Sequence, residues 1–174
     1  MINDYAKYIV SFIIYLLVIQ VLIINNINFG YYIHPNIYIL FLLILPIEIP
    51  GWLLLILSFI TGLTIDMFQN TPGIHTSASL FLGFFRPFVL KSIAPRNGYD
   101  IGTLPIPSHL GYLWFFKYIL ICTFLHHLLL FFVDNFSFSY FWSVILRVVL
   151  SSIFTVIFIF IIRLFSISSK KRNI

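Results

Sequence analysis

Residues 52–68 read WLLLILSFITGLTIDMF, an apolar run whose single charged residue is Asp66. A helix needs about 20 predominantly apolar residues to cross the hydrocarbon core of a bilayer, so this run predicts a transmembrane helix. The rest of the chain has the same character, because 61% of its 174 residues are hydrophobic and only 9% are charged. Soluble domains have about 25% charged residues. The composition therefore predicts an integral membrane protein.

Further apolar runs lie before and after this one. Together they predict an all-α membrane protein of about six transmembrane helices in a single domain. Pro46 and Pro50 break the chain between the second and third apolar runs, so we expect the second helix to be short, kinked or strongly tilted. Thr71 followed by Pro72 predicts the cap and first residue of the fourth helix. The expected spans are residues 8–24, 36–47, 52–68, 73–90, 112–133 and 140–165, with a loop at 91–111 and a basic tail at 166–174. The first run lacks a cleavage site of small residues, so we expect it to be retained.

Lysine and arginine residues predict the orientation, because they gather on the cytoplasmic side of membrane proteins. With six spans, one side receives Lys7, Lys91, Arg96, Lys117, Lys170, Lys171 and Arg172, and the connections on the other side receive none. We therefore expect both termini and the loop at 91–111 in the cytoplasm. A five-span arrangement would lose this agreement. The bases stand at the ends of apolar runs, which argues against nucleic-acid binding.

Small and polar residues recur on one face of three predicted helices. They are Ser58, Thr61, Gly62 and Asp66 in the third, Thr76, Ser79, Gly83 and Arg86 in the fourth, and Ser143, Arg147, Ser151 and Thr155 in the sixth. Small residues allow helices to approach closely, so we expect these three helices to share a packed interior. Asp66 and Arg147 lie in the same half of the membrane, which gives the hypothesis of a buried pair. Arg86 is expected to extend its side chain to the cytoplasmic interface.

Residues typical of catalysis or metal binding are few and scattered. His126 and His127 are adjacent, so their side chains point about 100° apart on a helix, and we expect them to form hydrogen bonds between helices or to lie near the interface instead of binding a metal. Cys122 has no partner for a disulfide within the chain. The acidic residues lie in separate regions, and no phosphate-binding loop or nucleophile motif occurs. We therefore predict that the chain is not an enzyme and needs no cofactor or metal.

The stretch Pro46–Pro87 resembles MreD, the rod shape-determining membrane protein of bacteria. The residues that carry this resemblance are Glu48, Pro50, Trp52, Gly62, Asp66, Pro72, Gly73, His75, Phe85, Arg86 and Pro87. Residues 94–103, 114–117 and 126–127 are similar to the MreD branch of Bacteroidetes-type bacteria. The short second span and the long loop after the fourth span depart from the broader family.

The resemblance implies a six-helix bundle similar to the substrate-binding subunits of energy-coupling-factor transporters. It also implies a non-enzymatic subunit of the cell-elongation (rod) complex, which scaffolds peptidoglycan synthesis in the bacterial inner membrane. The implied partners are an MreC-like periplasmic protein and, through it, an MreB-like actin filament, a RodA-type glycosyltransferase and a class B penicillin-binding protein. The alternative is a small-molecule-binding membrane subunit of a transporter. Together with the polar stripes, the resemblance leads us to expect structural roles within the membrane for Gly62, Asp66, Pro72, Gly73, Ser79, Gly83, Arg86 and Arg147.

Overall fold

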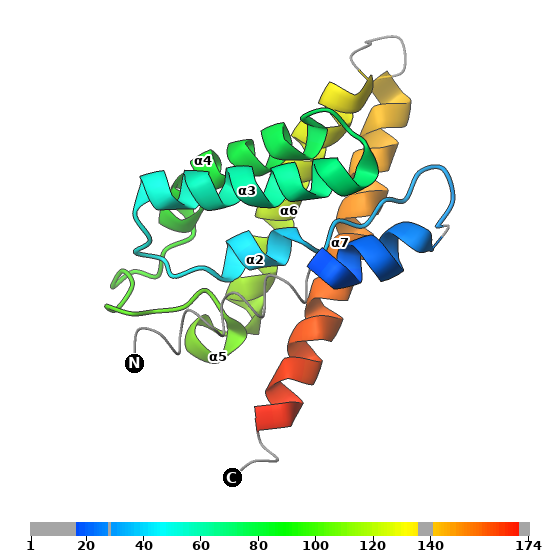
Figure 1. The fold of residues 1–174 in the computed structure, drawn as a ribbon. Coiled ribbons are helices and arrows are strands. Elements are labelled where there is room, and N and C mark those ends of the chain that lie inside the picture. Colours follow the sequence, from blue (N-terminus) through cyan, green and yellow to red (C-terminus); the bar gives the residue numbers. More distant parts are fainter. Residues whose placement is uncertain (1–16, 28, 136–140, 171–174) are drawn as a thin grey trace.

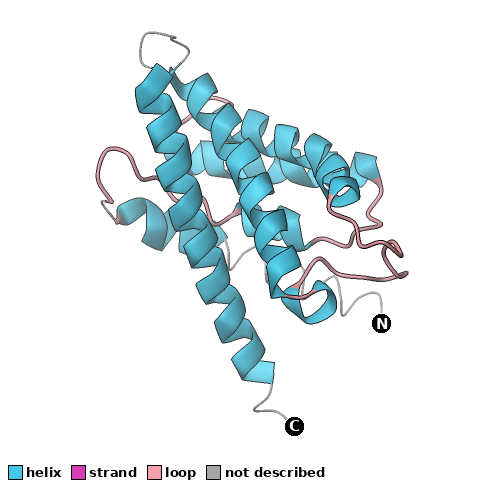
Figure 2. Cartoon of the chain, turned by 180° about the vertical axis from the view of Figure 1, so that it is seen from behind, coloured by secondary structure: helices cyan, strands magenta, loops and turns pink. Residues whose placement is uncertain are grey.

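The computed structural model describes residues 17–27, 29–135 and 141–170, and every regular element in these ranges is helical (Figures 1 and 2). The described chain begins with a short irregular helical segment, the π-helix η1 (Ile19–Ile23) and the 3-10 helix η2 (Ile24–Asn26). It continues with α2 (Ile39–Ile44), α3 (Gly51–Gln69), α4 (Ile74–Ser92), α5 (Pro107–Leu110), α6 (Tyr112–Asn135) and α7 (Phe141–Lys170). Residues 8–16 of the predicted first span and 171–174 of the predicted tail lie outside the described ranges.

Among the described residues, three helices are long and apolar enough to cross a membrane. They are Gly51–Gln69, Tyr112–Asn135 and Phe141–Arg163. The predicted all-helical fold is confirmed for the described residues, and the three apolar helices agree with a membrane protein, whereas the six spans and the likeness to energy-coupling-factor subunits stay predictions. Helix α4 is as long as α3, but its Arg86 and Lys91 and its stripe of hydroxyl groups make it more polar.

The helices α3, α4, α6 and α7 pack in that order, each against the next. Figure 1 shows α3 and α4 side by side, crossing the steeper pair formed by α6 and α7. Two glycines explain the close contact of α3 with α4. A Cβ atom at Gly62 would lie 2.5 Å from the Cα atom of Thr76, and one at Gly83 would meet the side chain of Ser58. The prediction that the third and fourth helices pack through their small residues is confirmed.

The hydroxyl stripe of α7 contacts a different part of the chain. The Ser151 hydroxyl accepts a hydrogen bond from the His34 backbone N–H (2.9 Å) and donates one to the Tyr32 carbonyl (3.3 Å). The Thr155 hydroxyl accepts from the Asn36 N–H (3.0 Å). The stripe of α7 thus faces this irregular segment and not the stripes of α3 and α4, although apolar residues of α7 share the core with both helices. Residues 32–36 are not helical, so their backbone groups need partners in the apolar interior, and the hydroxyl groups of α7 supply them.

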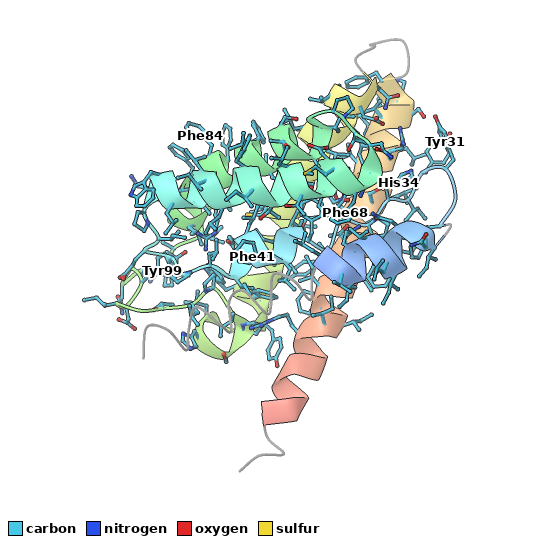
Figure 3. All side chains as sticks on the ribbon, in the orientation of Figure 1. Tyr31, His34, Phe41, Phe68, Phe84 and Tyr99 are labelled. Carbon is cyan, nitrogen blue, oxygen red and sulfur yellow. The ribbon has the colours of Figure 1, made fainter. Side chains whose placement is uncertain are left out.

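The second predicted span, 36–47, is helical only over α2. Six helical residues rise about 9 Å, much less than the hydrocarbon core of about 30 Å. Residues Ile39–Leu43 are at most 2% exposed, so other helices surround α2 on all sides. Phe41, which belongs to α2, lies at the centre of the molecule in Figure 3. The stretch is thus a short buried helix with irregular backbone on both sides.

The amino-terminal end of α2 receives its hydrogen bonds from the first helical segment. The Gln20 side-chain oxygen accepts from the backbone N–H groups of Ile37 (2.6 Å) and Tyr38 (3.4 Å), and Gln20 itself is fully buried. The first N–H groups of a helix have no partner within it. Gln20 therefore supplies an acceptor for the two residues that lead into α2.

The carboxyl-terminal end of α2 receives donors from α4 and α6. Arg86 donates to the carbonyls of Leu45 and Pro46, and its Nε atom donates to the Tyr118 hydroxyl (2.8 Å). The Tyr118 hydroxyl in turn donates to the Leu43 carbonyl (3.0 Å). The prediction that Arg86 extends to the membrane interface is wrong, because Arg86 is 1% exposed and points inward. The free carbonyls at the end of α2 explain this direction.

The connection between α4 and α6 is irregular from Ile93 to Ile106 and then forms the short helix α5. Two aromatic residues attach it to the bundle. The Tyr99 hydroxyl donates to the Leu90 carbonyl (2.7 Å), and the Trp114 indole N–H donates to the Ile93 carbonyl (2.9 Å). Tyr99, in this connection, lies at the left of the molecule in Figure 3, below α3.

Candidate functional site

A cavity of about 510 Å³ lies beside the turn between α3 and α4, close to the adjoining ends of α6 and α7. Its lining comes from η2 and the chain that follows it, from the turn between α3 and α4, and from the adjoining ends of α6 and α7. Figure 3 shows His34 and Phe68, two of its lining residues, close to one another. According to the distribution of lysine and arginine, this end of the bundle is the one expected outside the cytoplasm.

Asp66, near the end of α3, binds the beginning of α4. Its carboxylate accepts hydrogen bonds from the backbone N–H groups of His75 and Thr76, each 2.9 Å long. It also accepts from the hydroxyls of Thr71 (2.7 Å) and Thr76 (2.6 Å). A negative charge at the amino-terminal end of a helix is favourable, because unpaired N–H groups point toward it. Asp66 therefore joins α3 to α4 and caps α4.

These contacts correct two predictions. The hypothesis that Asp66 pairs with Arg147 is wrong, because the Asp66 carboxylate is saturated by α4 and its turn. Thr71 and Pro72 are not the cap and first residue of α4, which begins at Ile74. The residue before it, Gly73, has a φ of 83°, a backbone conformation that glycine adopts at no steric cost. Depth in the membrane alone could not reveal these partners.

A line of hydrogen bonds runs from the cavity into the bundle. The His75 ring, at the cavity, lies 3.0 Å from Gln69 Oε1 through Nε2 and 3.1 Å from the Tyr38 hydroxyl through Nδ1. The Tyr38 hydroxyl is also 2.8 Å from His126 Nε2. With Gln69 Oε1 as the acceptor, His75 Nε2 donates, so Nδ1 accepts from Tyr38, and Tyr38 accepts from His126. One direction of donation thus satisfies every contact in the line.

His127 forms a separate set of contacts beside this line. Its Nδ1 donates to the Thr123 carbonyl (2.9 Å), so its Nε2 is an acceptor. The Asn36 amide (3.3 Å) and the Thr155 hydroxyl (3.4 Å) approach this Nε2. His126 and His127 therefore bond to different neighbours, and the prediction of hydrogen bonds that link α6 to other segments is confirmed. Ser79, another predicted residue, is fully buried on α4.

Arg147 lies near the start of α7, at the wall of the cavity. Its Nη1 atom is 3.4 Å from Asp134 Oδ2. The guanidinium group lies over two aromatic rings, with its central carbon 5.2 Å from the centre of Tyr31 and 4.9 Å from that of Phe131. Contacts of this kind attract a cation to the ring faces. Arg147 thus pairs with Asp134 and not with Asp66.

His34 lies beside Arg147, and its Nε2 atom contacts both Arg147 and the Tyr31 carbonyl. Its Nε2 is 3.1 Å from the Tyr31 carbonyl and 3.4 Å from Arg147 Nη2. A carbonyl only accepts, so a His34 Nε2 that donates to Tyr31 cannot also accept from Arg147. Burial lowers the pKa of His34 from its usual value of 6.5, and the charge of Arg147 acts in the same direction.

Several residues of the site were not identified from the sequence. The role of Gln20 could have been predicted, since an amide within an otherwise apolar span commonly bonds to another helix. Asn36 and Asp134 stand at the ends of apolar runs, where polar residues are ordinary. Tyr38 gave no signal, because it is one of 10 tyrosines.

Comparisons of the chain with models of protein families, with curated proteins and with solved structures found no match. The family resemblance found in the sequence therefore stays a prediction.

Proposed function

We propose that the chain is a non-enzymatic membrane subunit of the bacterial cell-elongation (rod) complex, of the MreD type, which scaffolds peptidoglycan synthesis and cell-shape determination. One observation supports the proposal beyond the resemblance itself. Residues that carry the resemblance connect helices to one another. Gly62 allows α3 to pack against α4, Asp66 caps α4, and Arg86 binds the end of α2. Such connections make a rigid body, which a scaffold subunit requires.

In this proposal the chain crosses the inner membrane six times, with both termini in the cytoplasm, as a bundle similar to energy-coupling-factor substrate-binding subunits. The one-sided distribution of lysine and arginine supports the orientation. The buried segment around α2 would be the second crossing, since irregular backbone is tolerated at membrane depth where protein surrounds it. The cavity would then open toward the periplasm, the side of an MreC-like partner.

The partners in this proposal are the MreC-like periplasmic protein and, through it, an MreB-like actin filament, a RodA-type glycosyltransferase and a class B penicillin-binding protein. Large apolar side chains on α3, α6 and α7 remain exposed, including Trp52, Phe59, Leu113 and Trp142. Lipid or the membrane helices of a partner can cover these faces.

The cavity favours a second candidate, a small-molecule-binding subunit of a transporter. Its volume of about 510 Å³ lies within the range of about 300–1,000 Å³ found for ligand pockets. The two candidates differ in their partners, because a transporter subunit binds an energy-coupling ATPase complex and a rod-complex subunit binds cell-wall proteins.

Co-purification from the protein's own membranes tests the proposal. The tagged chain should recover an MreC-like protein, and depletion of the chain should make rod-shaped cells round. A Gly62→Leu variant should lose this partner, because it separates α3 from α4. The matched Gly51→Leu variant should retain it, since a Cβ at Gly51 meets no atom within 4 Å. Recovery of an ATPase subunit instead, together with unchanged cell shape on depletion, would refute the scaffold.

A further inference from the structure

The guanidinium group of Arg147 has more donors than partners. Its Nε atom is buried without a hydrogen-bond partner, and the contact of Nη2 with His34 Nε2 is long, at 3.4 Å. The single contact with Asp134 is long, at 3.4 Å, and the Asp134 side chain is 38% exposed. A long, partly exposed ion pair contributes little to stability. Arg147 therefore keeps hydrogen-bonding capacity at the wall of a cavity.

Two aromatic rings determine which parts of the Arg147 guanidinium group can bind a ligand. Tyr31 and Phe131 lie against the guanidinium group, so its N–H edges, which lie in the plane of the group, are the parts left to bind a ligand. Arg147, Asp134 and His34 all line the cavity. A planar arginine group binds carboxylate and phosphate oxygens through two parallel hydrogen bonds.

We propose that this cavity binds a zwitterionic ligand, with its carboxylate or phosphate on Arg147 and its ammonium group on Asp134. The two charges explain why neither a simple anion nor a simple cation fits as well. An anion on Arg147 meets the negative charge of Asp134, and a cation on Asp134 meets the positive charge of Arg147. A ligand that carries both charges replaces one long ion pair with two short ones.

Asp66 does not provide a competing site for the ammonium group, because its carboxylate oxygens already accept four hydrogen bonds from α4 and its turn. Phe68, Ile74 and Phe131 add apolar surface to the same cavity. These walls suit a zwitterion with an apolar part. Two sources have this chemistry: the phosphoethanolamine headgroup of a membrane phospholipid, and a free amino acid with an apolar side chain.

Calorimetric titration of the full-length protein in dodecyl maltoside micelles tests the inference. Three zwitterions serve as probes: dihexanoyl phosphatidylethanolamine, phosphoethanolamine and leucine. Dihexanoyl phosphatidylglycerol, which has the phosphate without the ammonium group, is the matched anionic probe. We expect at least one zwitterion to bind at least about tenfold more tightly than the anion. Binding only of the short-chain lipid identifies a membrane lipid, whereas binding of phosphoethanolamine or leucine identifies a soluble ligand.

Charge variants distinguish this site from nonspecific binding. Arg147→Gln should weaken binding of the zwitterion at least about tenfold, and Lys117→Gln, which removes an exposed base on α6, should leave it unchanged. Asp134→Asn should reverse the preference, with weaker binding of the zwitterion and stronger binding of phosphatidylglycerol, which damage to the fold would not produce. Three results would overturn the inference: no zwitterion binds the wild type, the anion binds it equally well, or Asp134→Asn leaves the preference unchanged. The inference concerns the cavity alone and holds for either candidate function.

Discussion

Replacing Gly62 by alanine should destabilise the bundle more than the same change at any other helical glycine of the described chain. The added Cβ would lie 2.5 Å from the Thr76 Cα, 2.7 Å from the His75 carbonyl oxygen and 2.9 Å from the Thr76 nitrogen. All three are backbone atoms, so no side-chain rotation removes the overlap. Ordinary van der Waals contact begins at 3.4 Å, so α3 and α4 must separate by about 0.9 Å.

The magnitude follows from two opposing effects. Inserting a methyl group into a packed contact costs about 1–3 kcal/mol, and the backbone contacts at Gly62 place it at the upper end. Alanine is favoured over glycine within a helix by about 1 kcal/mol. The net loss in the free energy of unfolding is therefore about 2 kcal/mol. Separation of the helices also lengthens the bonds from His75 and Thr76 to Asp66.

Two other glycines provide matched controls. At Gly83 the new Cβ meets the Ser58 hydroxyl, which can rotate away if it gives up its 2.8 Å hydrogen bond to the Leu54 carbonyl, and it lies 3.1 Å from the Ser58 Cβ, so Gly83→Ala should cost less than Gly62→Ala. Gly51→Ala meets nothing and should be neutral or slightly stabilising. Unfolding by SDS in mixed micelles, followed by tryptophan fluorescence, measures the order. A Gly62→Ala variant as stable as Gly51→Ala would refute this account of the α3–α4 contact.

Three further predictions use the same unfolding measurement. Asp66→Asn should lower the free energy of unfolding by about 2 kcal/mol, because charged hydrogen bonds to α4 are lost. The control Thr64→Val removes a hydroxyl that bonds within its own helix and should cost much less. Equal losses would contradict the capping role of Asp66. Arg86→Met should lower the free energy of unfolding by about 3 kcal/mol, because it leaves buried carbonyls at the end of α2 without donors. Lys91 is exposed, so the control Lys91→Met should have almost no effect. An Arg86→Met variant as stable as the wild type would contradict the contact with α2. Because burial lowers the pKa of His34, the unfolded chain takes up a proton near pH 6.5 that the folded protein resists, so the contribution of His34 to stability is complete above that pH and declines below it. His34→Gln should therefore lose less stability than the wild type between pH 7.5 and 5.5, and parallel pH curves would contradict this.

The sequence was most informative where one segment determines its own structure. Apolar runs bounded by polar residues identified α3, α6 and α7, because their length and composition suffice for a helix of that kind. Gly62 and Asp66 could be recognised as structural residues, since a small residue and a carboxylate in an apolar helix each require a neighbour.

The partners of these polar residues could not be predicted in the same way. Arg86 and the α7 stripe bind the backbone of residues 32–46, whose need for hydrogen bonds arises from its departure from a helix. Helical periodicity assumes a regular helix and so contains no information about such a segment. The pairing of Arg147 with Asp134 instead of Asp66 has a different cause, because the Asp66 carboxylate caps α4.

The dependence of α2 on four other parts of the chain has a consequence for biosynthesis. A segment inserted alone into lipid must satisfy its own backbone, and six helical residues with unpaired groups at both ends cannot do so. Gln20 is made before α2, but Arg86, Tyr118 and Thr155 are made after it. The region around α2 must therefore wait near the insertion machinery, or remain partly hydrated, until α7 has been synthesised. A chain that ends before Thr155 would leave the Asn36 N–H without this acceptor.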